Sequence, residues 1–389
     1  MIDASVPVLR EHGLAITRVF YSNMFSEHPE LKHVFNMGNQ ANGAQQQSLA
    51  AAVFAYAANI SQPAALAPVV ERIAHKHAAV GIKPAHYPIV ARHLLGAIRQ
   101  VLGDAATPAL LAAWDEAYWL LAGELIAAEA RLYERSGRDA GERMPLVVRE
   151  VTRESDEAIA LSLQAPDGSS PGAFAPGQYV SVAVELTERK LRQLRQYSLC
   201  GSPHATTWRI CVKREDGREA IPAGAVSNYL HTHIRPGDAL SVSAAFGNFT
   251  PPTDRKRPLA LISAGVGMTP MMAVLEALPA HSGQPVLFAH AAQSASKQVL
   301  TRELARAQAR IEGLTTMLWH EHCEPGSEAR SGRMTLTKGA LAPFEEADFY
   351  LCGPLPFMQE QWKALIALGI SPSRLHREVF GPDALDHLL

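Results

Sequence analysis

The hydrophobic pattern of this chain changes twice along its length, which limits the fold to a succession of different domains. Up to about residue 135, hydrophobic side chains recur at helical spacing. After a charged, glycine-containing stretch at 134–145, short β-branched runs alternate with turn sequences. A chain of 389 residues is also too long for one ordinary hydrophobic core. We therefore expect a multidomain protein.

The first block is predicted to be entirely helical. Its clearest helix has a hydrophobic stripe with steps of four and three residues, formed by Trp114, Tyr118, Leu121, Leu125, Ala128 and Leu132. Glu129 lies at the edge of this stripe, where a covered carboxylate needs a hydrogen-bond partner. Proline, glycine and N-cap residues separate this helix from earlier ones.

The two later blocks differ in how their strands are connected. Short strands without long helices between them predict an antiparallel β-barrel in the middle of the chain. From Lys256, apolar strands alternate with helices, which predicts an α/β domain with a parallel sheet. The expected domains are a helical domain at 1–136, a barrel at 146–255 and an α/β domain at 256–389.

Composition excludes several classes of partner. The net charge of −2 gives no electrostatic surface for nucleic acid or an anionic membrane. No run approaches the roughly 18 apolar residues of a membrane span, and the N-terminus does not resemble a secretory signal. The four cysteines form no CxxC or CxxCH motif, so neither a zinc ribbon, a disulfide framework nor thioether-linked haem is indicated. We expect a cytoplasmic protein without stable membrane insertion.

The stretch "HKHAAVGIKPAHY" contains three histidines, at positions 75, 77 and 86. On a helix, His75 and His77 lie about 200° apart around the axis, so they cannot share one metal ion. Pro84 breaks the helix before His86. Geometry therefore allows one metal ligand here at most, and it does not choose among the histidines.

Several motifs in the later blocks suit a nucleotide cofactor. In "RQYSL", Arg195 can meet a phosphate, Tyr197 a flat ring and Ser198 a ring nitrogen, provided that the strand ends at Ser198. In "GAVSNYLH", Ser227 is predicted to be the N-cap of a short helix whose free amides favour phosphate. An ordinary edge strand and an ordinary helix start are the alternatives.

Two glycine-containing turns follow strands of the α/β block. "SAGVGMTP" at 263–270 and "YLCGPLPFM" at 350–358 are both expected at the carboxyl edge of the sheet, where nucleotides bind. Cys352 and Gly353 should therefore lie beside the first turn. The turn is not a GxGxxG motif, and plain loop glycines are the alternative.

The order and spelling of these motifs resemble a known family. PGQY, RQYSL, GxVSNxLH, ISAGVGxTPM, YLCGPxxFM and FGP resemble the ferredoxin reductase-type module that binds FAD and NAD(P). "FYSNMFSEHPELKHVFNMGNQ" and "IAHKHAAVGIKPAHYPIV" resemble a bacterial globin. The combination is similar to bacterial flavohaemoglobins over essentially the whole chain. This resemblance implies haem b, FAD and NAD(P)H as cofactors.

The resemblance also implies an activity, nitric oxide dioxygenase. NAD(P)H would reduce FAD, FAD would reduce the haem iron, and the haem would use oxygen to convert nitric oxide to nitrate. The alternatives are an oxygen-binding or sensing haemoprotein with an auxiliary reductase, and an NAD(P)H-dependent ferric or flavin reductase. A monomer is favoured, and a lipid in the haem pocket is left open.

In the globin block, the matching residues acquire implied roles. His77 would be the proximal iron ligand, whereas His75 and His86 would be surface residues. Tyr87 and Glu129 match a proximal network that raises the donor strength of the histidine. The distal side is implied to contain polar and wall-forming residues, namely Tyr21, Gln45, Phe35 and Leu49. Lys76 and Glu378 match charged residues between flavin and haem.

In the reductase blocks, three groups of residues match cofactor contacts. The implied FAD contacts are Tyr179, Arg195, Gln196, Tyr197, Ser198, Val379, Phe380, Gly381 and Pro382. The implied phosphate and nicotinamide contacts are Val226, Ser227, Gly265, Val266, Gly267, Met268, Thr269 and Pro270. The chain departs from the family pattern at Met268, Tyr229 and Val379, and in its C-terminal extension. Lys297 could meet a 2′-phosphate, but the choice between NADH and NADPH stays open.

Overall fold

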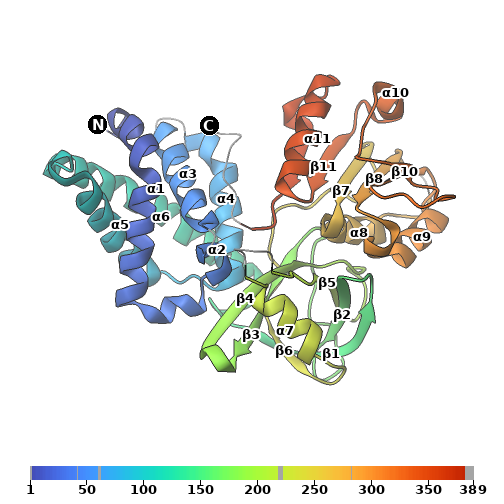
Figure 1. Cartoon of the computed structure of the whole chain (residues 1–389), viewed down its shortest axis with the longest axis horizontal. Helices are drawn as coiled ribbons and strands as arrows, with labels where there is room; N and C mark the ends of the chain where they lie inside the picture. Colours follow the sequence, from blue (N-terminus) through green and yellow to red (C-terminus); the bar gives the residue numbers. More distant parts are fainter. Residues whose placement is uncertain (1, 42, 60–62, 218–221, 282, 382–389) are drawn as a thin grey trace. The chain divides into compact units, whose positions relative to one another are not determined.

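A computed structural model describes residues 2–41, 43–59, 63–217, 222–281 and 283–381 (Figure 1). The chain divides into two compact units, which are described separately. The first comprises Met1–Arg143, Ser181–Arg195 and Gly381–Leu389, and the second comprises Met144–Val180 and Gln196–Phe380. Among the described residues, no helix has the length and apolar character needed to span a bilayer.

The first unit contains the predicted helical block. Its helices are α1 (Ile2–Glu27), η1 (Pro29–His33), α2 (Met37–Ala41), α3 (Ala44–Ala58), α4 (Pro63–Val80), α5 (His86–Leu102), η2 (Gly103–Ala105) and α6 (Pro108–Ser136). Helix α1 packs on α3 and α5, and α4 packs on α6. The core shared by α1, α5 and α6 includes Phe20, Met24, Ile98 and Trp114.

Local sequence explains where the helices begin and end. The Thr107 hydroxyl accepts a bond from the Leu110 amide at 3.2 Å and caps α6. Gly81 ends α4 with a φ of +87°, and a Cβ there would lie 2.6 Å from Cα of Gly141. Only glycine tolerates both conditions. The predicted break between the first and third histidines of the cluster is confirmed.

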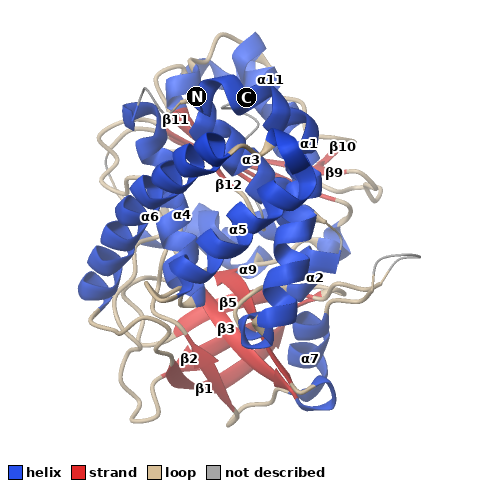
Figure 2. Ribbon diagram, turned by 90° about the vertical axis from the view of Figure 1, so that its left-hand side faces the viewer, coloured by secondary structure: helices blue, strands red, loops and turns tan. Residues whose placement is uncertain are grey.

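The middle of the chain forms the predicted antiparallel barrel. Its elements are β1 (Met144–Arg153), β2 (Ala158–Gln164), β3 (Tyr179–Leu186), η3 (Thr187–Arg189), β4 (Leu191–Ser198), β5 (Trp208–Lys213), α7 (Ala225–His233) and β6 (Ala239–Val242). The strand order is β4-β3-β6-β1-β2-β5. An antiparallel bridge between Leu199 and Ile210 joins the chain just after β4 to the opposite edge strand. Figure 2 shows these strands in red.

The last part of the chain is the predicted α/β domain. Its elements are β7 (Leu259–Ala264), η4 (Gly265–Gly267), α8 (Met268–Ala277), β8 (Val286–Ala292), η5 (Ala295–Lys297), α9 (Thr301–Arg310), β9 (Leu314–His320), β10 (Arg330–Ser331), α10 (Lys338–Leu341), η6 (Ala342–Phe344), β11 (Asp348–Cys352), α11 (Leu355–Ala367), η7 (Pro372–Arg374) and β12 (Leu375–Glu378). The strands are parallel, in the order β10-β9-β8-β7-β11-β12.

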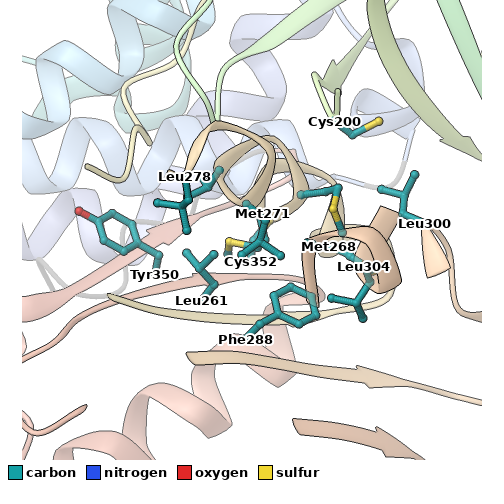
Figure 3. Close-up of a cluster of buried hydrophobic side chains, with 14 of the residues drawn as sticks. Cys200, Leu261, Met268, Met271, Leu278, Phe288, Leu300, Leu304, Tyr350 and Cys352 are labelled. Atoms are coloured by element: carbon teal, nitrogen blue, oxygen red, sulfur yellow. The ribbon is translucent and has the colours of Figure 1, made fainter. Parts of the chain in front are cut away.

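Strand β7 is buried on both faces, as its uninterrupted apolar sequence predicts. Leu259 and Leu261 point into one hydrophobic cluster with helices α8 and α9, and part of this cluster is drawn in Figure 3. Ala260 and Ile262 point into a second cluster with α11. The fold class is therefore confirmed: a helical domain, an antiparallel barrel and a parallel α/β domain.

Candidate functional site

Three helices of the first unit bring His77, Tyr87 and Glu129 together. Nδ1 of His77, in the last turn of α4, lies 2.8 Å from Oε1 of Glu129 on α6. The Tyr87 hydroxyl, at the start of α5, donates to the same carboxylate oxygen at 2.6 Å and lies 3.3 Å from His77 Nδ1. No sequence spacing rule links these positions, which are separated by up to 52 residues.

The hydrogen bonds of this triad, anchored by the buried Glu129, fix the orientation of the imidazole. Only 2% of the Glu129 side chain is exposed, against 34% of the His77 side chain. Burial, reinforced by the Glu129 carboxylate, raises the pKa of Tyr87, so the phenol stays protonated and donates. A hydrogen on Nδ1 pointing at the carboxylate leaves the lone pair on Nε2, where no described residue binds it. A histidine held in this way is suited to metal ligation.

Two tyrosines of α6 support the same region, and sequence analysis missed their role. Tyr118 donates to the backbone carbonyl of Tyr87 at 2.7 Å, and Tyr133 donates to the carbonyl of Ile82 at 2.8 Å. Both hydroxyls thus hold the turn and helix start that follow the histidine. The signal was present, because Tyr118 belongs to the predicted stripe of α6 and Tyr133 lies one turn beyond Glu129.

The expectation that His75 is a surface residue is wrong. Its exposed fraction is 7%, and its burial, together with the charge of Arg135 on α6, lowers its pKa to about 4. Helix α4 packs along α6, and this packing covers His75. His86 is half-buried, so it is not a freely exposed residue either.

The predicted distal residues lie together in the core of the helical block. Tyr21 on α1 is buried, and its ring contacts Phe25 and Phe35, with centroids 5.7 and 5.9 Å apart respectively. Its side chain hydrogen-bonds to Gln45 on α3, although burial dominates and raises the pKa of the phenol. Phe35 and Leu49 pack against the same cluster. The result is a polar pair enclosed by apolar walls.

The two charged residues predicted between the cofactors have different surroundings. Lys76 Nζ donates to the Gly381 carbonyl at 2.8 Å, and both belong to the first unit. Glu378 belongs to the second unit, where it is buried at the end of β12 and pairs in register with Cys352. Burial, with a smaller contribution from the charge of Glu378, raises the pKa of Tyr179.

Ser198 has the position that a cofactor-binding hydroxyl requires. Strand β4 ends at Ser198, as the sequence argument demanded, and the side chain is 5% exposed. Its Oγ has no hydrogen-bond partner among the described residues. Unpaired buried hydroxyls are rare because they forfeit their bonds to water. The atom therefore fits a ligand with a polar ring atom, such as a flavin.

The other predicted flavin contacts vary in exposure. Tyr179 is buried, and its amide donates to the Phe246 carbonyl at 2.8 Å. A Cβ on Gly247 would lie 3.0 Å from the Tyr179 ring, so this ring needs a glycine beside it. The remaining residues range from buried Val379, through half-buried Arg195, Tyr197 and Gly381, to exposed Gln196 and Phe380. Pro382 lies outside the described residues.

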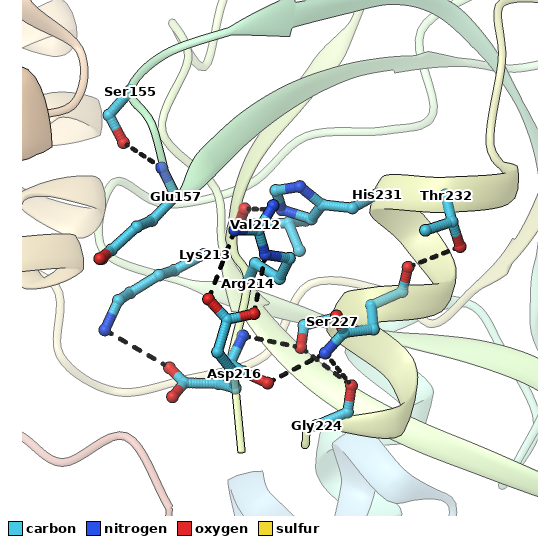
Figure 4. Close-up of polar contacts among 12 residues, drawn as sticks. Ser155, Glu157, Val212, Lys213, Arg214, Asp216, Gly224, Ser227, His231 and Thr232 are labelled. Atoms are coloured by element: carbon cyan, nitrogen blue, oxygen red, sulfur yellow. Dashed lines mark hydrogen bonds and ion pairs between the residues drawn. The ribbon is translucent and has the colours of Figure 1, made fainter. Parts of the chain in front are cut away.

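The prediction that Ser227 caps α7 is wrong, because the N-cap is Gly224. Ser227 lies three residues later, where its Oγ donates to the Gly224 carbonyl at 3.2 Å and accepts from the Glu215 amide at 3.2 Å (Figure 4). A Cβ on Gly224 would lie 2.7 Å from this hydroxyl. The serine ties the helix start to the end of the preceding strand segment, and Val226 beside it is buried. First-turn amides still point outward from the helix end, as at any N-terminus.

The two glycine-containing turns meet at the sheet edge, as predicted. Strands β7 and β11 are neighbours, and a Cβ on Gly267 would lie 2.2 Å from the Cys352 carbonyl oxygen. The turn is formed by Gly265, Val266 and Gly267, followed by Met268, Thr269 and Pro270 in the first turn of α8. Thr269 Oγ1 donates to the Val266 carbonyl at 2.8 Å.

Met268 points into the protein core. Its side chain is fully buried in the hydrophobic cluster shared with Met271 and Leu300 (Figure 3). The methionine at this position, where the chain departs from the family pattern, is therefore a core residue. Lys297 is also engaged, since its Nζ lies 2.5 Å from Oε1 of Glu157 and 2.9 Å from Oε1 of Gln293.

Comparison with protein families matches three regions of the chain. A globin model matches residues 18–125, an oxidoreductase FAD-binding domain model matches 145–250, and an oxidoreductase NAD-binding domain model matches 261–363. Curated flavohemoproteins match over the full length. That of Rhizobium meliloti is 43% identical, covering 98% of this chain and 97% of the relative, and that of Chromobacterium violaceum is 44% identical, covering 98% and 96%.

Solved structures agree with these matches. The crystal structure of flavohemoglobin from Malassezia yamatoensis, with bound FAD and haem, has a TM-score of 0.86 and 29% identity, covering 98% of this chain and 97% of that one. The FAD/NAD-binding domain of nitric oxide dioxygenase from Vibrio cholerae has a TM-score of 0.57 and 38% identity, covering 62% of this chain and all of that one.

Proposed function

Because the chain belongs to the flavohemoprotein (flavohaemoglobin) family, we propose that it is an NAD(P)H-dependent nitric oxide dioxygenase, which uses oxygen to convert nitric oxide to nitrate. The observation that carries the proposal is the His77–Glu129–Tyr87 triad in a globin domain joined to a flavin reductase in one chain. A carrier of oxygen needs no such electron supply within its own sequence.

Three cofactors are assigned: haem b, FAD and NAD(P)H. When bound, the flavin accepts two electrons from NAD(P)H and releases them singly, and the haem iron supplies the site at which oxygen and nitric oxide react. His77 would hold the iron through Nε2. This assignment is supported by the bond from Nδ1 to Glu129 and by the partial exposure of the imidazole.

The proximal triad would strengthen His77 as a ligand. Glu129 accepts the Nδ1 hydrogen, which shifts electron density toward Nε2, and Tyr87 orients the carboxylate by donating to the same oxygen. A stronger donor favours oxygen activation over reversible binding. The proposal therefore gives Glu129 and Tyr87 a role in the reaction as well as in packing.

On the opposite side, Tyr21 and Gln45 would form the polar part of an apolar pocket lined by Phe35 and Leu49. Burial keeps the Tyr21 phenol protonated, so it can donate a hydrogen bond to partial negative charge on the substrate. The surrounding aromatic rings exclude water and strengthen that bond.

The reductase part would bind its cofactors along strand ends. FAD would be held by Tyr179, by Arg195 to Ser198 and by Val379 to Pro382, with the unpaired Ser198 hydroxyl supplying a bond to the ring. First-turn amides at Val226 and Ser227 would meet phosphate, and Gly265 to Pro270 would meet the nicotinamide half of NAD(P)H. The charges of Lys76 and Glu378 would adjust the reduction potentials of the haem and the flavin.

The proposed domains are the haem domain at 1–136, the FAD barrel at 146–255 and the NAD(P)-binding domain at 256–389. We place the protein in the cytoplasm as a monomer that acts on small molecules, without a nucleic-acid partner.

Anaerobic mixing with NADH tests the electron path directly. The purified chain, supplied with haem and FAD, should show flavin bleaching followed by conversion of the ferric to the ferrous haem spectrum. His77→Ala should retain flavin bleaching and lose the Soret band. A wild-type chain that binds flavin but no haem would overturn the proposal.

A further inference from the structure

One buried glutamine of the β3–β4 hairpin contacts the helical block, and no cofactor motif accounts for it. Gln193 on β4 is 2% exposed. It belongs to the segment Ser181–Arg195, which forms part of the first compact unit together with the globin helices. The hairpin is basic in sequence, "ELTERKLRQLRQYSL", and bends through the short helix η3.

The side-chain amide of Gln193 hydrogen-bonds through both its nitrogen and its oxygen to the backbone that runs from η1 to the start of α2. Its Nε2 donates to the carbonyls of Lys32 at 3.0 Å and Phe35 at 3.3 Å, and it also lies 3.0 Å from the carbonyl oxygen of Arg192 on its own strand. Its Oε1 accepts from the Met37 amide at 3.1 Å. Donors facing carbonyls and an acceptor facing an amide define the orientation of the side chain uniquely. The next residue along the hairpin adds a contact, because the Arg192 amide donates to Nδ1 of His33 at 3.0 Å.

The backbone segment that Gln193 holds and the strand that carries Gln193 both have roles in the proposed function. The backbone that Gln193 holds contains Phe35, a wall of the haem pocket whose ring contacts Tyr21. Two residues beyond Gln193 along β4 lies Arg195, a proposed FAD contact, whose Nη1 lies 3.5 Å from Gln193 Oε1. A Cβ on Gly38 would lie 3.4 Å from Nη2 of Arg195, so the strand and the segment approach closely there.

We propose that Gln193 is a positioning residue that fixes the haem-pocket segment 32–37 against the flavin-binding strand, and thereby sets the rate of electron transfer from flavin to haem. This inference rests on the proposed function for its kinetic part. Gln193 itself is shielded from water, so loss of its amide removes the hydrogen-bond donor of the Lys32 and Phe35 carbonyls and the acceptor of the Met37 amide without water readily replacing it.

The first test measures the contact itself and does not require enzymatic activity. In hydrogen–deuterium exchange of the full chain loaded with haem and FAD, Gln193→Leu should accelerate exchange in peptides that contain Met37 and leave peptides from α11 unchanged. Gln164→Leu is the matched control, since Gln164 makes its bonds within the barrel, to Arg149 and Gly168. Unchanged exchange at Met37 in Gln193→Leu would overturn the proposal.

The second test separates two electron-transfer steps in the same preparation. With NADH, Gln193→Leu should bleach the flavin and reduce ferricyanide at the wild-type rate, whereas haem reduction should slow by about tenfold or more, as small misplacements do. Gln193→Asn, which retains the amide on a shorter side chain, should reduce the haem at a rate between those of the wild type and Gln193→Leu. Wild-type haem reduction in Gln193→Leu would refute the role of this residue. Failure of the wild-type chain to reduce haem at all would instead refute the proposed function.

Discussion

His77 Nδ1 lies 2.8 Å from Oε1 of Glu129, although 52 residues separate them in the sequence. The carboxylate is buried and its second oxygen, Oε2, has no partner among the described residues. Its stabilisation therefore depends on the imidazole hydrogen and on the Tyr87 hydroxyl. These two hydrogen bonds offset the cost of burying a carboxylate in the core of a helical domain, where an unpaired charge is unfavourable.

Glu129→Gln should weaken His77 as an iron donor. A neutral amide oxygen pulls less on the Nδ1 hydrogen, so electron density at Nε2 falls and the haem reduction potential rises, by an amount on the order of tens of millivolts. Spectroelectrochemical titration measures this shift. Glu134→Gln, an exposed residue on the same helix, is the control and should leave the potential unchanged. An unchanged potential in Glu129→Gln would show that the carboxylate has only a packing role.

Tyr21→Phe should make oxygen leave the ferrous haem faster. The phenol is the buried donor on the proposed distal side, and a bond to a partly charged acceptor is worth about tenfold or more in affinity. Phenylalanine fits among the neighbouring rings, so the fold should persist. Flash photolysis or stopped-flow mixing gives the dissociation rate. Tyr229→Phe, in the barrel, should behave as the wild type, and equal rates in both variants would remove Tyr21 from the distal site.

Ser198→Ala should have opposite effects on stability and on flavin binding. Without FAD, removal of a buried unpaired hydroxyl should leave the melting temperature unchanged or raise it, because such a group costs about 1–3 kcal/mol. With FAD, the variant should bind more weakly, since the ring loses a bond. Fluorescence titration and calorimetry measure the two effects. Ser202→Ala, a nearby serine outside the motif, should change neither, and normal flavin affinity in Ser198→Ala would contradict its assignment.

The stability of the reductase part should decrease as pH falls below about 6.5, and His290 should account for part of the decrease. Burial, with a smaller effect of His320, lowers the His290 pKa from 6.5 to about 3. Between these values the unfolded chain binds a proton that the folded chain rejects, so acid favours unfolding. His290→Gln should flatten the decline in unfolding free energy between pH 7 and about pH 4. Urea unfolding at each pH, monitored by the release of flavin, gives the unfolding free energy.

His281→Gln is the control for the pH experiment, because this side chain is 88% exposed. The unfolding free energy of this variant should vary with pH as that of the wild type does. A slope in His290→Gln as steep as in the wild type would mean that other groups dominate the acid sensitivity of this domain.

The fold was largely predictable because its signals are local. A buried strand such as β7 is a continuous apolar run, and the helix break is marked in the sequence by Gly81 and by Pro84 three residues later. The errors arose where tertiary packing decides. His75 was expected at the surface, yet the packing of α4 on α6 buries it. Ser227 has the chemistry of an N-cap, but its hydroxyl is used by the Glu215 amide, and the helix begins earlier.

The site was predictable only in part from the residues alone. Helix geometry showed that His75 and His77 cannot share a metal ion, but the choice of His77 came from the family resemblance. The pairing of His77 with Glu129 is a long-range contact without a sequence spacing to announce it. The buried Met268 and the contacts of Gln193 likewise depend on what packs against them, which a single sequence does not encode in any short pattern.

The most direct test of the central claim is stopped-flow consumption of nitric oxide by the haem- and FAD-loaded chain with NADH and oxygen, with nitrate measured at the end. We expect rapid consumption with one nitrate formed per nitric oxide, and its loss in His77→Ala while flavin reduction by NADH persists. Rapid reduction of the haem by NADH without nitrate formation, or full activity in His77→Ala, would contradict the account.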